Sequence, residues 1–276
     1  MPVWDCHIHC YAGDETATDL LVQMDEGGVT RATVMSQFRA DFRELCAPVS
    51  LEDQHACIDH VAGLQQADPD RVYGLFWADP RTEGFLDEVQ YALEDKGLHG
   101  IKLIPDHWTA GDEFLFPLYE KVRELNKVIM FHSGILYAFG DSSRFCQPVL
   151  FEALLNFPGL RFSLAHIGWP WVDECLAVFG HFNSAAAHRG NASEMWIDTC
   201  RGTPDAWRLE ARQKAAAFCG TNRLMFGTDT YPANLGKVAP LHVGKDMDIL
   251  RHQIGLRDAQ LEDFFWNSAE AFYAGT

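Results

Sequence analysis

Short apolar runs alternate with longer amphipathic stretches along almost the whole chain, and this alternation restricts the fold more than any other feature. Eight of the runs are rich in β-branched or aromatic residues and are predicted as strands: residues 3–10, 31–38, 71–80, 100–105, 128–134, 161–168, 195–200 and 224–229. The stretches between them repeat apolar residues every three or four positions, as helices do, for example 85–97, 116–126, 147–157 and 205–220. Gly97 and Gly220 stand where helices commonly end.

Strict alternation of strands and helices predicts parallel strands joined by right-handed crossovers. Eight such units correspond to an α/β fold, the (βα)8 or TIM barrel, with two additional C-terminal helices expected at 245–255 and 261–274. A doubly wound open sheet is the alternative, but it usually has fewer strands and often a Gly-rich first turn, which this chain lacks. No linker interrupts the pattern, so we expect a single domain over residues 1–276.

The 276 residues include 22 Lys and Arg against 39 Asp and Glu, which gives a formal net charge of -17. Such a balance opposes binding to nucleic acid or to an anionic membrane and suits a small-molecule substrate. The eight cysteines are scattered, which favours reduced thiols over a disulfide framework. With no signal-peptide pattern and no apolar run long enough to cross a bilayer, we expect a cytoplasmic protein.

The first predicted strand contains the sequence DCHIHC. Because side chains alternate between the faces of a strand, His7 and His9 are expected on one face, with Asp5 one step deeper. Cys6 and Cys10 are expected on the other face, packed against the surrounding helices as small core residues. His7 and His9 can therefore share a metal ion. A zinc finger would need a second ligand pair nearby, and the chain has no CxxC sequence.

Polar residues also stand near the ends of several other predicted strands, which is where TIM barrels place their chemistry. These residues are Lys102 on the fourth strand, His132 on the fifth, His166 on the sixth, Asp198 and Arg201 at the seventh, and Asp229 on the eighth. Any one of them could be a hydrogen-bonded structural residue or a helix cap. Four strand ends that offer nitrogen or carboxylate ligands at one rim nevertheless indicate a shared metal site.

The stretches DCHIHC, GIKLIP, MFHSG, LAHIGWPW and MFGTDTYP together resemble the amidohydrolase superfamily. They are most similar to its amidohydrolase-related branch, which includes non-oxidative decarboxylases such as aminocarboxymuconate semialdehyde decarboxylase. The resemblance spans the predicted barrel but says little about the substrate. It implies that His7, His9 and His132 bind a metal ion, and that Asp229 is a further ligand or moves a proton to and from metal-bound water. It also implies that His166 contacts the reacting group or orients the water.

One divalent metal ion, with zinc expected, suits this set of imidazoles and a carboxylate, and it would lower the pKa of bound water toward 7. Lys102 leaves an alternative open. In binuclear members of the superfamily, a strand-four lysine is carbamylated and bridges two metals, with the histidines of strands five and six on the second ion. In the resembling branch the lysine generally remains an amine and one metal is bound. We expect the second arrangement, in which Lys102 would be a buried amine paired with an acid such as Asp198.

The signals for substrate binding are weaker. Lys102 and Trp108 are candidates for contact with a substrate. Arg144 and Arg201, like Arg39, could pair with a substrate carboxylate, since a guanidinium matches a carboxylate with two parallel hydrogen bonds. Surface ion pairs would equally account for these arginines. Further aromatic residues that could line a pocket or simply pack in the core are Trp77, Tyr137, Trp169 and Trp171.

The preferred function is a metal-dependent hydrolase that uses metal-activated water on a C–N or C–O bond of a small organic substrate. A non-oxidative decarboxylase of an aromatic or unsaturated carboxylic acid would use the same ligands. A PHP-type phosphoesterase also begins with HxH but would need more His and Asp motifs in the middle strands. A non-catalytic metal-binding barrel is the alternative that is not an enzyme. A homodimer is compatible with the sequence, which gives no sign of an interface.

Overall fold

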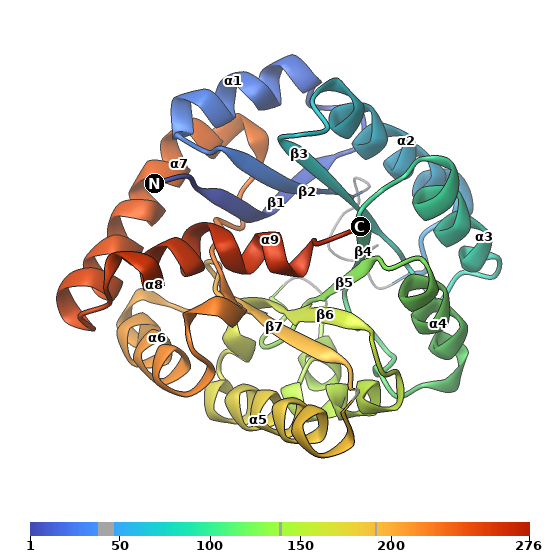
Figure 1. Cartoon of the computed structure of the whole chain (residues 1–276). Helices are drawn as coiled ribbons and strands as arrows, with labels where there is room; N and C mark the ends of the chain where they lie inside the picture. Colours follow the sequence, from blue (N-terminus) through green and yellow to red (C-terminus); the bar gives the residue numbers. More distant parts are fainter. Residues whose placement is uncertain (38–46, 138–139, 191) are drawn as a thin grey trace.

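The computed structural model describes residues 1–37, 47–137, 140–190 and 192–276. In these residues eight parallel strands form one sheet in the order β1 to β8, and the prediction of a TIM barrel is confirmed (Figure 1). The strands are β1 (Trp4–Tyr11), β2 (Arg31–Gln37), β3 (Val72–Trp77), β4 (Gly100–Leu103), β5 (Val128–Phe131), β6 (Arg161–Leu164), β7 (Glu194–Asp198) and β8 (Leu224–Met225). Residue 38, predicted as the end of the second strand, lies outside the described residues.

Backbone hydrogen bonds between β1 and the turn after β8 close the barrel. The N–H of Asp229 donates to the carbonyl oxygen of His7 at 2.8 Å. The N–H of His9 donates to the carbonyl oxygen of Thr230, also at 2.8 Å. Three of these four residues are predicted site residues, and Thr230 directly follows Asp229. The same backbone contacts therefore close the barrel and assemble the site.

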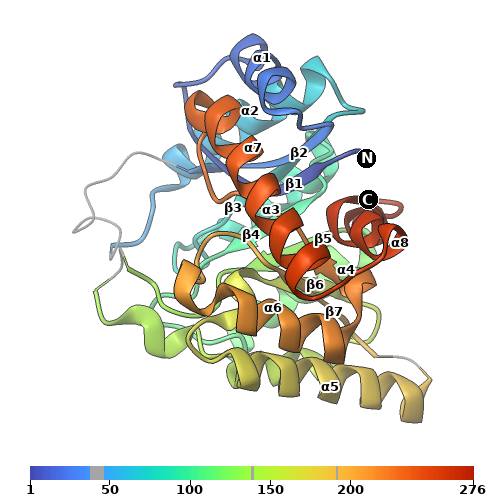
Figure 2. The same cartoon turned by 90° about the vertical axis from the view of Figure 1, so that its left-hand side faces the viewer.

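Helices cover the outside of the barrel (Figure 2). They are α1 (Ala17–Gly27), α2 (Leu51–Ala67), α3 (Phe85–Gln90), α4 (Phe116–Glu124), α5 (Val172–Arg189), α6 (Asp205–Cys219) and α7 (Pro232–Met247). The helix expected at 245–255 forms as the last residues of α7 and the π-helix η7 (Asp248–Gln253) that continues it. α7 itself starts earlier than expected, at Pro232, where a proline ring presets the helical φ of the first turn. The stretch 147–157 forms a 3-10 helix, η4 (Pro148–Asn156). No helix in the described part of the chain is long and apolar enough to cross a membrane.

The last helices of the chain cover the amino ends of the strands. They are α8 (Asp258–Glu262), η8 (Asp263–Asn267) and α9 (Ser268–Phe272). α9 lies across the opening of the barrel in Figure 1, and Phe272 and Tyr273 pack against Trp4 and Trp196 in the barrel interior. Arg161 donates to the carbonyl oxygen of Phe272 at 2.8 Å, which satisfies a helix end that would otherwise lack a partner.

β1 contains an irregularity between Asp5 and Ile8, where its pairing register with β2 shifts. A bulge of this kind interrupts the alternation of faces. As a result Cys6 packs inside the barrel with Met35, and the prediction that it faces the surrounding helices is wrong. Cys10 does pack in the core that the helices share with the outer face of the sheet, as expected.

Several strands end earlier than predicted, and the site residues lie in the turns beyond them. β5 ends directly before His132, and β6 ends two residues before His166. β8 has two residues, so Asp229 follows four positions after it. His166 and Asp229 both have positive φ, 61° and 54°. The backbone must leave the strand ladder at these positions to turn the side chains across the mouth of the barrel.

Asp5 joins β1 to the turn after β8. It is fully buried and accepts hydrogen bonds from the N–H of His7 at 3.1 Å and from the N–H and hydroxyl of Thr228 at 3.0 Å and 2.7 Å. Burial raises the pKa of Asp5 to about 7, although the hydrogen bonds from Thr228 and His7 lower it in part. The carboxyl group therefore acts as a structural link that is protonated in mildly acidic solution.

Asp5→Asn should make stability less dependent on pH. In the unfolded chain this carboxyl ionises near pH 4, whereas in the folded protein it ionises near pH 7, so the folded protein binds the extra proton between these values. Its contribution to stability is complete at low pH and falls as the pH rises to 7. The asparagine variant should therefore lose less unfolding free energy between pH 5 and pH 7, by about 2 kcal/mol, in urea titrations with a chelator present.

Asp70→Asn, which removes an exposed carboxylate, is the matched control. An unchanged pH dependence in Asp5→Asn would show that the carboxyl of Asp5 ionises at the same pH in the folded and unfolded chains.

Candidate active site

His7 and Asp198 form a buried pair across the barrel. Nδ1 of His7 lies 2.5 Å from Oδ2 of Asp198, and both side chains are at most 1% exposed. Burial alone would raise the pKa of Asp198, but the adjacent His7 and its hydrogen bond outweigh burial, and the pKa is lowered. Burial, followed by the charge of Lys102, lowers the pKa of His7, so the ring is neutral at pH 7. Asp198 accepts the Nδ1–H, which leaves Nε2 of His7 unprotonated.

Two other predicted ligands, His9 and Asp229, lie close to this unprotonated Nε2 of His7. Nε2 of His9 lies 3.0 Å from Nε2 of His7, and Oδ1 of Asp229 lies 3.6 Å from His7 and 3.3 Å from His9. The three ligand atoms all lie within 4.8 Å of one another. Burial raises the pKa of Asp229, but its hydrogen bond with His9 and the nearby His7 and His166 outweigh that effect and hold it well below its usual range. The group therefore offers two imidazole nitrogens and an ionised carboxylate.

This set of donors fits a divalent cation. Ligands at 2.0–2.1 Å from a tetrahedral zinc ion lie about 3.3 Å from one another. The separations of 3.0, 3.3 and 3.6 Å among His7, His9 and Asp229 bracket that value. Nitrogen and carboxylate donors also suit other first-row divalent ions. Asp198 behind His7 is the kind of carboxylate that fixes the orientation of a metal-binding histidine.

His132 and His166 form a second pair at the same rim. Nε2 of His166 lies 3.2 Å from Nδ1 of His132, and Nε2 of His132 lies 3.1 Å from the carbonyl oxygen of Ile135. The N–H of Gly202 donates to Nδ1 of His166 at 3.2 Å. Because an N–H can only donate and a carbonyl can only accept, both neutral rings carry their proton on Nε2. His166 lies next to the three-ligand group, since its ring centroid is 5.4 Å from that of His7.

Both rings of this pair are neutral at pH 7. Burial lowers the pKa of His166 to about 4, and burial together with His166 and Lys102 lowers the pKa of His132 well below its usual range. Nδ1 of His132 is the ring atom that could face a cation, and in the structure it accepts from His166. The role of His132 as a metal ligand stays a prediction, as do the catalytic roles of His166 and Asp229.

The family of the chain follows from a comparison with known proteins. The family model described as Amidohydrolase matches residues 4–275, which is nearly the whole chain. This chain belongs to the amidohydrolase family. The resemblance drawn from the strand-end motifs is therefore confirmed, and the chain is an enzyme of the amidohydrolase superfamily.

The related proteins have several activities. A 2-keto-4-carboxy-3-hexenedioate hydratase from Sphingobium sp. (strain NBRC 103272 / SYK-6) is 26% identical over 135 residues, which is 41% of this chain and 40% of that protein. An uncharacterised TIM-barrel protein from Bordetella bronchiseptica is 18% identical, with a TM-score of 0.70 and coverage of 100% of this chain and 99% of that one. A dihydroxybenzoic acid decarboxylase from Polaromonas sp. JS666, with bound manganese and the inhibitor 2-nitroresorcinol, is 14% identical, with a TM-score of 0.67 and coverage of 99% and 96%. The match to the hydratase spans less than half of that protein. The two solved structures, from Bordetella and Polaromonas, share the fold of this chain.

Lys102 lies inside the amidohydrolase site but does not pair with Asp198. Its side chain is 1% exposed, and its Nζ lies 3.5 Å from Nε2 of His7. Burial lowers the pKa of Lys102, while Asp198 partly opposes this shift. The predicted ion pair between the two is not formed in the part of the chain that the structure describes, because Asp198 is held by His7. The amine instead faces the nitrogen on which the predicted ligands converge.

The other three candidate substrate-binding residues show no contact with this group of ligands among the described residues. Trp108 is 2% exposed and packs in the main hydrophobic core. Arg144 is 64% exposed and pairs with Asp141 at 3.3 Å. Arg201 is exposed in the turn after β7. Arg39 lies outside the described residues. Contact with a substrate stays a prediction for each of them.

The predicted aromatic residues have different environments. Trp77 packs with Leu136 and Cys146, while Tyr137 is exposed. Trp169 and Trp171 line a separate pocket on the outside of the barrel.

Sequence analysis does not single out two residues that contact His166. Sγ of Cys200 lies 3.0 Å from Nδ1 of His166 and 3.4 Å from Nδ1 of His7. Burial raises the pKa of the Cys200 thiol well above its ordinary value, so the group is a neutral thiol at pH 7. Gly202 approaches the ring of His166 so closely that a Cβ atom there would lie 2.4 Å from it. The signal in the sequence is the TCRG stretch directly after the seventh strand.

Gly202→Ala should displace the ring of His166. The added methyl group would lie 2.4 Å from two ring atoms of His166 and 2.6 Å from its Cβ, distances that force the imidazole to move. We expect at least about a 10²-fold loss in turnover of any substrate, the usual scale for a misplaced acid or base, with little change in thermal stability. Kinetics and a crystal structure of the variant would measure both effects.

Gly63→Ala is the matched control, because a Cβ at this helical position meets nothing within 4 Å. Normal turnover in Gly202→Ala would show that the position of His166 is not critical.

Proposed function

We propose that the chain is a metal-dependent enzyme that uses activated water to hydrolyse a C–N or C–O bond of a small organic substrate. The observation that carries this proposal is the convergence of His7, His9 and Asp229, whose ligand atoms lie within 4.8 Å of one another at the mouth of the barrel. Two neighbouring residues supply an orienting carboxylate and a hydrogen-bond donor. Asp198 orients His7, and His166 offers a hydrogen-bond donor 5.4 Å away between ring centroids.

His7, His9 and Asp229 would hold one divalent cation, with His132 as a further ligand, and we expect zinc. When bound, the cation would supply Lewis acidity that brings the pKa of a water molecule close to 7. The manganese in the Polaromonas decarboxylase shows that a barrel of the same fold can hold a different divalent ion. With one ion Lys102 would remain an unmodified amine, because a bridge between two ions would require a carbamate at Nζ.

Two side chains would move or hold protons during the reaction. Asp229 is ionised at pH 7, so its Oδ1 can accept a proton from a water molecule at this rim. The pKa of His166 is about 4, so the ring acts as a neutral donor through its Nε2–H and not as an imidazolium. In the structure this N–H points to Nδ1 of His132. If His132 uses that nitrogen to bind the cation, the Nε2–H of His166 becomes available to a carbonyl oxygen of the substrate.

The same residues could serve two other reactions, and the named relatives favour both. Addition of water to a C=C bond would use the same delivery of water, and the Sphingobium relative is a hydratase. Decarboxylation would need proton delivery to carbon, and the Polaromonas relative is a decarboxylase. The products distinguish the three reactions. Hydrolysis cleaves the substrate and places an oxygen atom from labelled water in a fragment, hydration adds that oxygen without cleavage, and decarboxylation releases carbon dioxide.

Purified protein should contain about one divalent ion per chain, and His7→Ala/His9→Ala should lose it. The double variant removes two of the three convergent donors, and the remaining carboxylate is a weak ligand by itself. Elemental analysis after dialysis measures the loss. His55→Ala/His60→Ala, which removes two histidines of α2, is the control. Unchanged metal content in the first variant would refute the ligand assignment, and two ions per chain would indicate a carbamate on Lys102.

His166→Asn should keep the metal and lose at least about 10²-fold in turnover. Asparagine tolerates the positive φ at this position, so the backbone should be preserved, while the proton donor at Nε2 is lost. Metal content and steady-state kinetics on the same samples separate the two effects. His181→Asn, an exposed histidine of α5, is the control. If His166→Asn turned over normally with normal metal content, the proposed role of His166 would be wrong.

A further inference from the structure

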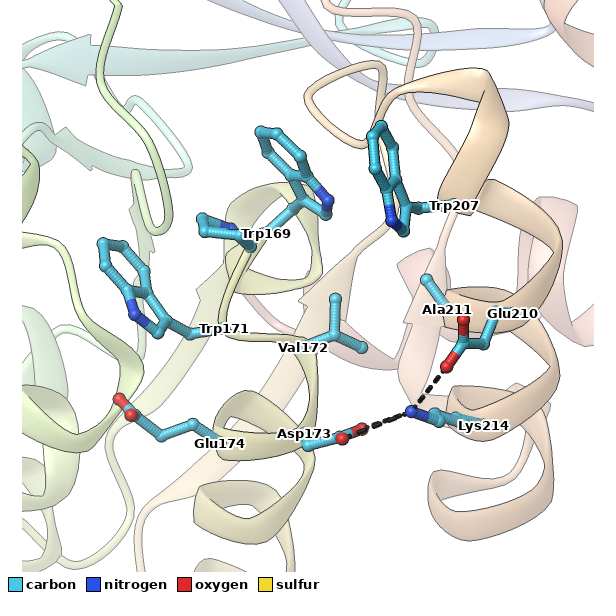
Figure 3. Close-up of a pocket in the computed structure, with 10 residues that line it drawn as sticks. Trp169, Trp171, Val172, Asp173, Glu174, Trp207, Glu210, Ala211 and Lys214 are labelled. Carbon is cyan, nitrogen blue, oxygen red and sulfur yellow. Dashed lines mark hydrogen bonds and ion pairs between the residues drawn. The ribbon is translucent and has the colours of Figure 1, made fainter.

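A pocket on the outside of the barrel is lined by three tryptophans. It has a volume of about 450 Å³ and lies between the turn that precedes α5 and the start of α6. Trp169 and Trp171 come from the turn, and Trp207 comes from α6 (Figure 3). None of the predicted metal ligands lines it. The volume is within the range of sites that bind small organic molecules.

One of the three indole rings of this pocket is largely exposed to solvent. Trp207 is 52% exposed, whereas Trp169 and Trp171 are half-buried. The rings of Trp169 and Trp207 lie 5.8 Å apart at 51°, so they form two adjoining walls and not a closed stack. No Lys or Arg among the described residues lies over any of the three rings. Among the described residues, an arginine lies over the rings of Trp4, Trp196 and Trp266 instead.

The polar side of the pocket carries a surplus of negative charge. In Figure 3 the amine of Lys214 lies between Asp173 and Glu210, at 2.9 Å and 2.8 Å from their carboxylates. Glu174 adds a third carboxylate, which accepts the N–H of Val149 at 2.9 Å. The lining therefore carries three carboxylates and one ammonium. Negative charge in the lining repels the carboxylate form of a carboxylic acid, the class of substrate that the named relatives act on. The same charge favours binding of a cation.

We propose that this pocket binds an organic cation of the quaternary or alkylated ammonium class. Aromatic faces attract such cations through the negative charge at the centre of each ring, and tryptophan is the strongest of the three aromatic side chains in this respect. A weakly hydrated cation gains more from the indoles than a strongly hydrated one, because less water must be removed from it. The carboxylates of Asp173, Glu174 and Glu210 supply the compensating charge. This site is separate from the metal centre and does not depend on the reaction that the enzyme catalyses.

Choline is a suitable probe, and 3,3-dimethylbutan-1-ol is its neutral counterpart with nearly the same shape. We expect choline to bind the purified protein and to shift the indole N–H signals of Trp169, Trp171 and Trp207 in two-dimensional NMR spectra. The neutral alcohol should bind more weakly. Trp207→Ala should weaken choline binding by about 2- to 30-fold, the range measured for contacts between cations and aromatic rings.

Two further variants make the test specific. Asp173→Asn/Glu210→Gln should weaken the binding of choline but not that of the alcohol, because only the charge of the lining changes. Phe218→Ala removes another exposed aromatic side chain of α6 that does not line the pocket, and it should leave binding unchanged. The proposal is overturned if millimolar choline leaves the three indole signals in place, if the alcohol binds as tightly as choline, or if Trp207→Ala binds choline normally.

Discussion

The hydrogen bond between Asp198 and His7 is the interaction on which the rest of the site depends. It joins the first and seventh strands through the interior of the barrel, where neither side chain reaches water. An unpaired carboxylate in that position would cost several kcal/mol, and the bonds from the Nδ1–H of His7 and the N–H of Cys200 offset much of this cost. The same bond fixes which nitrogen of His7 points outward. A single buried contact therefore both stabilises the barrel and selects the atom that the other predicted ligands approach.

The backbone beside these residues is held in conformations that most side chains avoid. His166, Ile167 and Asp229 all have positive φ, which costs on the order of 1–3 kcal/mol at each residue. Local contacts oppose a return to extended geometry. The N–H of Asp229 bonds to the carbonyl oxygen of His7, and the hydroxyl of Thr203 bonds to that of His166 at 3.1 Å. The contacts that close the barrel thus also hold the strained turns that aim the site residues across its mouth.

The alternation of strands and helices was enough to predict the barrel, because a parallel sheet of eight such units can close only with all its carboxyl ends at one rim. For the same reason, polar residues at strand ends predicted the grouping of His7, His9 and Asp229. Cys6 was misplaced because a bulge has no signature in a pattern of small and apolar residues. The predicted ion pair of Lys102 with Asp198 was wrong, because the sequence does not show which strands face one another across the barrel. Gly202 follows the seventh predicted strand directly, but its importance arises only when the ring of His166 packs against it, which the sequence does not show.

Two turns at the mouth of the barrel contribute residues both to the predicted metal centre and to the aromatic pocket. The turn after β6 places His166 inward and Trp169 outward three residues later, and the N–H of Trp169 donates to the carbonyl oxygen of His166 at 3.1 Å. The turn after β7 likewise supplies Gly202 to the ring of His166 and leads to Trp207 on α6. The two proposed sites would take cations of different kinds. A small, strongly hydrated metal ion gives up its water only to converging lone pairs, whereas a bulky ammonium ion needs aromatic faces and diffuse negative charge. The acidic balance of the chain, which disfavours polyanions, is compatible with both.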